Sequence, residues 1–291
     1  MMFLNHLVNG ISLGSVYAII ALGYTMVYGI AKMLNFAHGD VIMVGAYMAF
    51  CTTVYLSWPP FMAILLAMAV CTILGVTIEF LAYRPLRSAT SLAVLITAIG
   101  VSFFLQNTAL LIWKANSKNF PSFVPLDGVR IGGLLITGEA LTTIFTCIIV
   151  MVCLTLFTSK AKMGKAMRAV SEDKAAAQLM GINVNRTISV TFAIGSALAA
   201  IAGILLCSSY PLLSPTTGAM PGIKAFTAAV FGGIGSIPGA MIGGILLGII
   251  EVFGKAYIST QLADAIVFSV LIIVLLVKPT GLLGKKTREK V

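Results

Sequence analysis

The chain has 291 residues, of which 59% are hydrophobic and only 10% charged, and its mean hydropathy is +1.05. A soluble domain carries about 25% charged residues, so this composition excludes a soluble globular protein. The net charge of +10 is spread over short segments between apolar runs rather than over a folded domain. That pattern excludes nucleic-acid binding and is typical of the basic cytoplasmic loops of membrane proteins.

Several charge-free runs are long enough to cross a bilayer, which takes about 20 apolar residues in a helix. These runs are 1–31, 41–78, 88–113, 140–159, 187–223 and 225–250. Ser57–Pro60 interrupts the second run and predicts a turn between two spans. We therefore expect an all-α integral membrane protein with one domain, residues 1–291. It should be a polytopic helical bundle of about 8–10 membrane segments, some broken or re-entrant.

The segment Leu34–Asp40 is the first candidate break, since it precedes an apolar helix. Two interpretations stand: a cytoplasmic turn in which Asp40 caps the next helix, or a corner inside the membrane beside a transport path. In the second, Asn35, His38 and Asp40 belong to the path, where a charge costs about 2.5–3.5 kcal/mol on the insertion scale. His38 alone is more typical of a structural histidine than of a proton relay.

The most polar part of the chain is the segment 160–187, hereafter the island. Eight of the 28 Lys, Arg, Asp and Glu residues lie in it. The excess of basic residues places the island in the cytoplasm together with Arg84, Arg87 and the Lys285–Lys290 tail. Two spans separate Arg87 from the island, so the segment 114–138 between them is expected to be an extracytoplasmic loop. Its prolines, Pro121 and Pro125, and Asp127–Gly128 predict that it is ordered.

Within the island, a short helix is expected over 171–183. Ser171 can cap its start, while Glu172 and Asp173 suit the first turn, where the helix dipole favours negative charge. The alanines that follow favour helix, and Gly181 can end it in the left-handed conformation.

The C-terminal third has a parity problem. Three plain helices over 188–208, 224–256 and 261–278 would place the basic tail outside, against the charge bias. A fourth crossing arises if 224–256 is split at Gly232–Gly239 and the first piece is completed by an unwound stretch, 211–222. Broken helices at membrane depth line wet cavities or lie within protein, and in transporters they mark the substrate path. Pro215, Pro221 and Gly222 are therefore candidate path residues.

Small residues recur every fourth position in three places, which aligns them on one helix face and permits close approach of backbones. The three sets are Gly10/Gly14/Ala18, Gly195/Ala199/Gly203 and Gly235/Gly239/Gly243, with Gly244/Gly248 beside the last. Packing within the subunit is favoured over a dimer seam.

The sequence has no phosphate-binding loop of the form Gly-x-x-x-x-Gly-Lys-Ser/Thr, so it predicts no nucleotide site of its own. Gly248–Lys255 and Gly281–Thr287 both fail the spacing. With two histidines and no clustered carboxylates, we expect no metal site, no catalytic residues and no cofactor.

Three motifs together resemble the membrane permease subunit of branched-chain amino-acid ABC importers, the LivH type. They are Asn35–Asp40, the island stretch from Arg168–Asp173 to Gly181–Asn183, and Ser214–Pro215 through Gly222–Val230 with Gly232–Ser236. The resemblance covers nearly the whole chain. ABC importer permeases carry a Glu-Ala-Ala-x-x-x-Gly loop that docks on the ATPase. Here Ala176, Ala177 and Gly181 match it, Ala175 stands in place of the acid, and Glu172 and Asp173 are the nearest carboxylates.

The resemblance implies a non-enzymatic, multi-pass subunit in the plasma (inner) membrane of a prokaryote. It implies a path for branched-chain or related amino acids, driven by ATP hydrolysis on partner subunits. The implied partners are a second permease subunit, two cytoplasmic ABC ATPase subunits, an extracytoplasmic solute-binding protein and membrane lipid. Two alternatives stay open: a self-sufficient secondary transporter or channel for a small polar solute, and an ABC permease for urea or amides. The scarcity of charge within the spans counts against the first.

Overall fold

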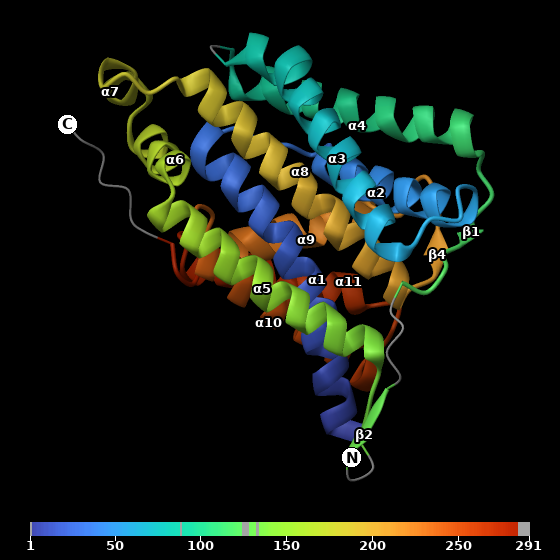
Figure 1. The fold of residues 1–291 in the computed structure, drawn as a ribbon. Coiled ribbons are helices and arrows are strands. Elements are labelled where there is room, and N and C mark those ends of the chain that lie inside the picture. The colour runs from blue at the N-terminus through green and yellow to red at the C-terminus, as the bar shows by residue number, and fades with distance from the viewer. Residues whose placement is uncertain (1, 88, 124–127, 132–133, 285–291) are drawn as a thin grey trace.

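A computed structural model of the chain describes residues 2–87, 89–123, 128–131 and 134–284. The helices form one bundle, with α1 in its interior (Figure 1). In chain order the elements are α1 (Met2–Ala31), α2 (His38–Val54), α3 (Pro60–Ile78), η1 (Glu79–Tyr83), η2 (Arg84–Leu86), α4 (Ser91–Trp113), β1 (Lys118–Asn119), β2 (Val129–Ile131), β3 (Leu134–Ile136), α5 (Gly138–Lys160), α6 (Lys162–Glu172), α7 (Lys174–Leu179), α8 (Val184–Ser209), β4 (Leu212–Leu213), α9 (Ala219–Gly232), α10 (Ile237–Tyr257) and α11 (Ala263–Val277).

Six of the described helices are long and apolar enough to cross a membrane: α1, α3 with its extension to Leu86, α4, α5, α8 and α10. The apolar α11 is shorter, with 15 residues. α2 and α9 have 17 and 14 residues, and each follows an irregular segment. α3, α4 and α5 expose apolar side chains on the outside of the bundle, as lipid-facing helices do. The prediction of a polytopic helical membrane protein is confirmed.

The stripes of small residues pack helices together within the chain. A Cβ on Gly14 of α1 would lie 2.6 Å from the Cα of Ile245 in α10, and one on Gly244 would lie 2.5 Å from the Cα of Ala18. Contacts this close exist only because the side chain is a hydrogen atom, so these glycines set the distance between α1 and α10. This supports the prediction of packing within the subunit for this pair of stripes. Gly235, by contrast, lies in a turn outside any helix.

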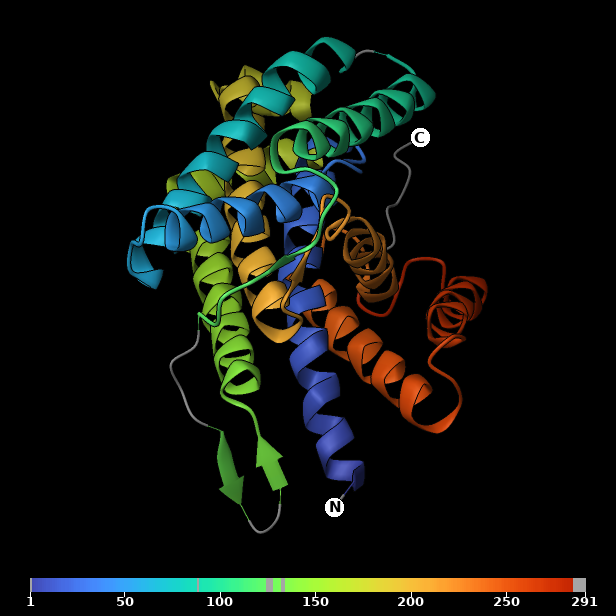
Figure 2. The ribbon, with the colours of Figure 1, turned by 90° about the vertical axis from the view of Figure 1, so that its right-hand side faces the viewer.

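The two ends of the bundle can be told apart by what lies at each. At the first, the island end, Lys174 Nζ of α7 donates a 2.9 Å hydrogen bond to the carbonyl of Ala31, the last residue of α1. At the second, the hairpin end, the start of α1 lies near the β2–β3 hairpin (Figure 2). α1 therefore runs from the hairpin end to the island end.

The predicted split in the C-terminal third is confirmed. α9 ends at Gly232 and α10 begins at Ile237. Gly233 and Gly235 in the turn between them have φ of +107° and +94°, a conformation that glycine adopts without strain. After α11, the N–H of Leu282 bonds to the carbonyl of Phe231 at 2.9 Å, so the chain returns to the end of α9. Lys285–Lys290, the basic tail, lie outside the described residues.

The segment 114–138 is ordered where it is described. β1 pairs antiparallel with β4, with Lys118 opposite Leu213. This pairing joins the segment to the residues that follow α8. The rings of Phe120 and Phe123 stack with centroids 5.1 Å apart and are buried. Short strands therefore join an otherwise helical fold. Pro125 and Asp127 lie outside the described residues.

Candidate functional site

The first break separates α1 from α2. α1 ends at Ala31, Lys32 has a φ of +58°, and helix resumes only at His38. The N-cap residue of α2 is Ala37, with no side-chain cap bond, and Asp40 lies in the first turn. The interpretation of Asp40 as the cap is therefore wrong. Asn35, His38 and Asp40 are all buried.

Neighbouring helices hold this corner by polar contacts. Tyr83 donates its hydroxyl to Asn35 Oδ1 at 2.9 Å, and Gln106 Nε2 of α4 donates to Asp40 Oδ1 at 2.9 Å. The His38 ring lies edge-on against the ring of Tyr24, with centroids 4.6 Å apart. Among the described residues, His38 Nε2 and Asp40 Oδ2 have no hydrogen-bond partner. Buried polar atoms without partners cost free energy, so these two atoms make the corner a candidate functional site.

The second break lies between α8 and α9, over residues 210–218. Pro215 lies in the turn that the hydrogen bond from Ser214 N–H to Thr217 Oγ1, 2.7 Å, closes. α9 begins at Ala219, so Pro221 and Gly222 lie in its first turn and not in an unwound stretch. The predicted unwound segment, 211–222, extends too far, because α9 already begins at Ala219. The reason is that proline is tolerated in the first turn of a helix, where its missing N–H has no partner to lose.

The two breaks touch each other, which the sequence did not predict. A Cβ on Gly39 of α2 would lie 2.7 Å from the carbonyl oxygen of Gly218, and one on Gly222 would lie 2.9 Å from the Cα of Gly39. The backbone at the start of α2, next to Asp40, is therefore in direct contact with the end of the second break and the first turn of α9. Three glycines, one near the start of α2 and two at the start of α9, make this contact possible.

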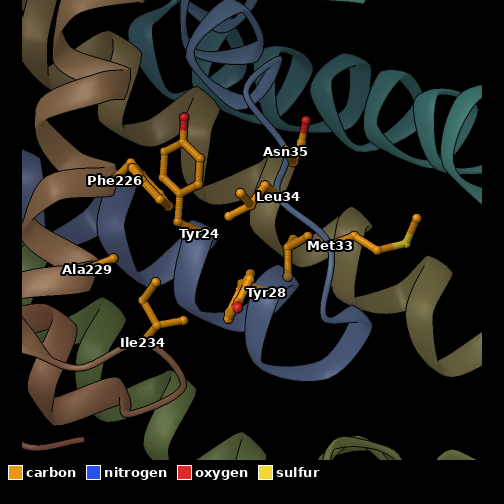
Figure 3. A pocket seen from close by; sticks show the side chains of 9 residues that line it. Tyr24, Tyr28, Met33, Leu34, Asn35, Phe226, Ala229 and Ile234 are labelled. Atoms are coloured by element: carbon orange, nitrogen blue, oxygen red, sulfur yellow. The ribbon is translucent and has the colours of Figure 1, made fainter. Parts of the chain in front are cut away.

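A small, partly enclosed cavity lies beside this contact, between α1, the 32–37 segment and α9. Tyr24, Tyr28, Asn35, Phe226 and Ile234 are among the residues that line it (Figure 3). Its volume of about 10 Å³ leaves room for a single water molecule. The structure thus has the two breaks pressed together.

A buried ionic network behind α9 is the main feature that sequence reasoning missed. Glu251 of α10 accepts hydrogen bonds from Lys224 Nζ (2.8 Å), Lys255 Nζ (2.6 Å) and the Tyr17 hydroxyl (2.8 Å). Lys224 also pairs with Asp264 of α11 at 2.6 Å. Glu251 is 1% exposed, so its carboxylate is buried within the bundle. Lys224 was a usable signal, because it is the one charge between two long charge-free runs.

The island folds as two helices and not as one. α6 ends at Glu172, and Asp173 caps α7, accepting from the N–H groups of Ala175 and Ala176 at 2.9 and 3.0 Å. Ser171 does not cap, since its hydroxyl donates to the carbonyl of Arg168. The prediction of one helix over 171–183 is therefore wrong at its start. The reason is that Asp173 is extended, with φ −153°, which breaks the helix at that point.

The end of α7 is as predicted, with Gly181 in the left-handed conformation at φ +81°. Ala177 is buried and accepts from Ile182 N–H at 3.0 Å, so it holds the turn. The two residues before Gly181, Leu179 and Met180, are 89% and 83% exposed. Two large apolar side chains at the tip of a polar segment are unusual, because none of the residues that the structure describes covers them.

The base of α7 is attached to the bundle. Lys174 donates to the carbonyl of Ala31, and burial, followed by the positive charges of Arg87 and Lys32, lowers the pKa of Lys174. Arg87 in turn pairs with Glu79, which also accepts from Ser189 of α8. The tip of the island is therefore exposed, while the base of α7 is held to the end of α1 by the Lys174 hydrogen bond.

Comparison with known proteins gives one family over almost the entire chain. The family described as "Branched-chain amino acid transport system / permease component" matches residues 6–275. BraD, the high-affinity branched-chain amino acid transport system permease protein of Pseudomonas aeruginosa, is 46% identical over 301 residues, 99% of this chain and 98% of that one. LivH of Escherichia coli K12, described in the same words, is 46% identical over 302 residues with the same coverage.

Similarity extends to an archaeon and to one solved structure. A probable LivH of Methanocaldococcus jannaschii is 30% identical over 281 residues, 91% of this chain and 88% of that one. PsaBC from Streptococcus pneumoniae, solved in complex with a Fab, has a TM-score of 0.50 at 15% identity, covering 94% of this chain and 91% of that one. At this identity the likeness is one of fold alone.

Proposed function

The chain belongs to the family of permease components of branched-chain amino acid transport systems, and from this premise we propose that its two touching breaks form the gate of the transport path. It is a multi-pass membrane protein, the transmembrane component of an ABC transport system, and it is not an enzyme. The family implies partners within that system. The proposed partners are a second permease subunit, two cytoplasmic ABC ATPase subunits and an extracytoplasmic solute-binding protein, in a prokaryotic plasma (inner) membrane.

The observation that carries the proposed path is the contact of Gly39, in the first turn of α2, with Gly218 and Gly222 at the start of α9. Irregular backbone at membrane depth is tolerated where it is buried in protein or lines a wet cavity, and in transporters such breaks lie at the substrate site. Asn35 and Pro215 lie in the two irregular segments, while His38 and Asp40 lie in the first turn of α2 and Pro221 and Gly222 in the first turn of α9. Because the backbones at Gly39 and Gly218 are in direct contact, passage of an amino acid between them requires α9 to move away from α2.

Labelling of introduced cysteines tests this path. We expect a cysteine at Pro215, in a background without the native cysteines, to react with a membrane-impermeant thiosulfonate in the assembled transporter. Its rate should change by about tenfold or more when the ATPase is trapped with ATP, because the segment moves. A cysteine at Leu111, 85% exposed on the outside of α4, is the control and should react with lipid-soluble maleimides alone. If Pro215→Cys behaved like the Leu111 control, the proposed path would be wrong.

We also propose that the tip of the island docks on the ATPase. The predicted coupling residues are Glu172, Asp173, Ala176, Ala177 and Gly181. Of these, Asp173 and Ala177 fix the fold of α7, and Gly181 turns the chain. Leu179 and Met180 present the contact surface. Beside them lies a groove of about 440 Å³ lined by residues from Gln178 to Asn185. A partner that buries both side chains gains about 1.5–3 kcal/mol for each.

Replacing both Leu179 and Met180 by Glu is therefore expected to abolish ATPase recovery and uptake while the permease still inserts. Both side chains are exposed in the free chain, so the substitution leaves its packing intact. The measurement is pull-down of the ATPase subunits and leucine uptake at matched expression. Exchange of the two residues, Leu179→Met with Met180→Leu, keeps the apolar surface and should behave as wild type. Normal recovery of ATPase by the Glu variant would rule out this surface.

A further inference from the structure

A second cavity, larger and more polar, lies at the hairpin end of the bundle. Its volume is about 590 Å³, within the range of pockets that bind small molecules. The walls come from the first half of α1, the first turn of α5, the last residues of α8 and the last turns of α10. All four segments lie at the end away from Ala31 and the island, so the cavity is separate from the smaller one beside Tyr28.

The lining of this cavity is complementary to an amino acid. It holds one carboxylate, Glu139, and one ammonium group, Lys255. Leu13, Val16 and Val252 give it an apolar wall. Opposite charges combined with an aliphatic surface match the three parts of a zwitterion with a branched apolar side chain: its carboxylate, its ammonium group and its hydrocarbon.

We propose that this cavity is an entry site for the transported amino acid. Lys255 binds the α-carboxylate, Glu139 binds the α-ammonium group, and the side chain lies against Leu13 and Val252. This rests on the proposed function and deepens it, because it assigns a substrate site that precedes the gate at Gly39 and Gly218.

Lys255 is free to bind a ligand without leaving a buried charge unpaired. Its side chain is 37% exposed, and it contacts Glu251, which is also bonded to Lys224 and Tyr17. When Lys255 turns toward a carboxylate in the cavity, Glu251 therefore keeps two of its three donors, and the large cost of an uncompensated buried carboxylate is avoided.

Glu139 is likewise available to bind a ligand. It lies in the first turn of α5, where the helix dipole stabilises its charge, and it forms no ion pair within the described part of the chain. The caps of this helix are already in place, since Thr137 Oγ1 accepts from Ala140 N–H at 3.3 Å. The carboxylate of Glu139 is therefore not needed for the fold of α5.

The test uses the complete transporter, with its second permease and its ATPase subunits, in lipid nanodiscs without the solute-binding protein. Binding of radiolabelled leucine is measured, with 4-methylpentanoate and isopentylamine as competitors that carry one charged group each. We expect Lys255→Gln to weaken leucine binding about tenfold and to remove competition by the acid but not by the amine. Glu139→Gln should remove competition by the amine but not by the acid. Lys255→Arg, which keeps the positive charge, should restore competition by the acid.

A structural role for either residue would weaken both competitors equally, so the split between acid and amine is decisive. Lys278→Gln, an exposed lysine at the end of α11, is the matched control and should bind leucine as the wild type does. Unchanged leucine binding in Lys255→Gln, or equal loss of both competitors, would overturn the entry site, while uptake by the wild-type complex would still support the proposed function. Failure of the wild-type complex to import leucine with its solute-binding protein would overturn both.

Discussion

Leucine uptake is expected to fall about tenfold or more when Gly218 is replaced by Ala. The added methyl group would press against the carbonyl oxygen of Gly39, so the start of α9 must move away from α2. Overpacking of this kind costs about 1–3 kcal/mol, and 1.4 kcal/mol corresponds to a tenfold change in an equilibrium. The measurement is uptake by the reconstituted transporter at matched amounts of inserted protein.

The same substitution at Gly100 is the control. That glycine lies in α4 with open space around the position of a Cβ, so Gly100→Ala adds one methyl group without a contact. Its uptake should equal that of the wild type. If Gly218→Ala transported as fast as Gly100→Ala, the contact between the two breaks would have no part in transport.

Replacement of Glu251 by Leu is expected to give the largest loss of stability in the chain. Two lysines and the Tyr17 hydroxyl would lose a shared partner, with Lys224 itself only 7% exposed. Removing one member of a buried ion pair costs about 3–5 kcal/mol. The melting temperature of the purified transporter in detergent should fall accordingly.

Asp264→Asn is the matched comparison, because it touches the same network from a partly exposed position. The Asp264 side chain is 48% exposed, and pairs that reach solvent contribute about 1 kcal/mol or less. A much smaller fall in melting temperature is expected. Equal falls for the two variants would show that the energy of the network does not reside in the burial of Glu251.

Most of the architecture follows from apolar runs and helix breakers. The turn at Ser57–Pro60, the split at Gly232–Gly239 and the left-handed Gly181 are all found where the sequence places them. These features depend on local chemistry: missing N–H groups, absent Cβ atoms and long apolar stretches. The start of α7 was misplaced, because Ser171 and Asp173 are both good caps and only the tertiary structure selects between them.

The contacts of the candidate site could not be predicted in the same way. Gly39 and Gly218 belong to breaks that the sequence shows separately, and their contact depends on how α2 and α9 pack. The same holds for Lys224 and Glu251, which lie 27 positions apart and meet across two helices. Residue types and apolar runs indicate which segments enter the membrane, but not which distant segment each of them faces.

The ionic network of Lys224 has a consequence for how the protein is made. A lysine inside a membrane segment costs about 2.5–3.5 kcal/mol until it finds its partners. Those partners, Glu251 and Asp264, are synthesised after it, on α10 and α11. Helix α9 is also too short to span alone. It should therefore settle into the bundle only after the last third of the chain has left the ribosome, so that assembly of the gate is the final step of biogenesis.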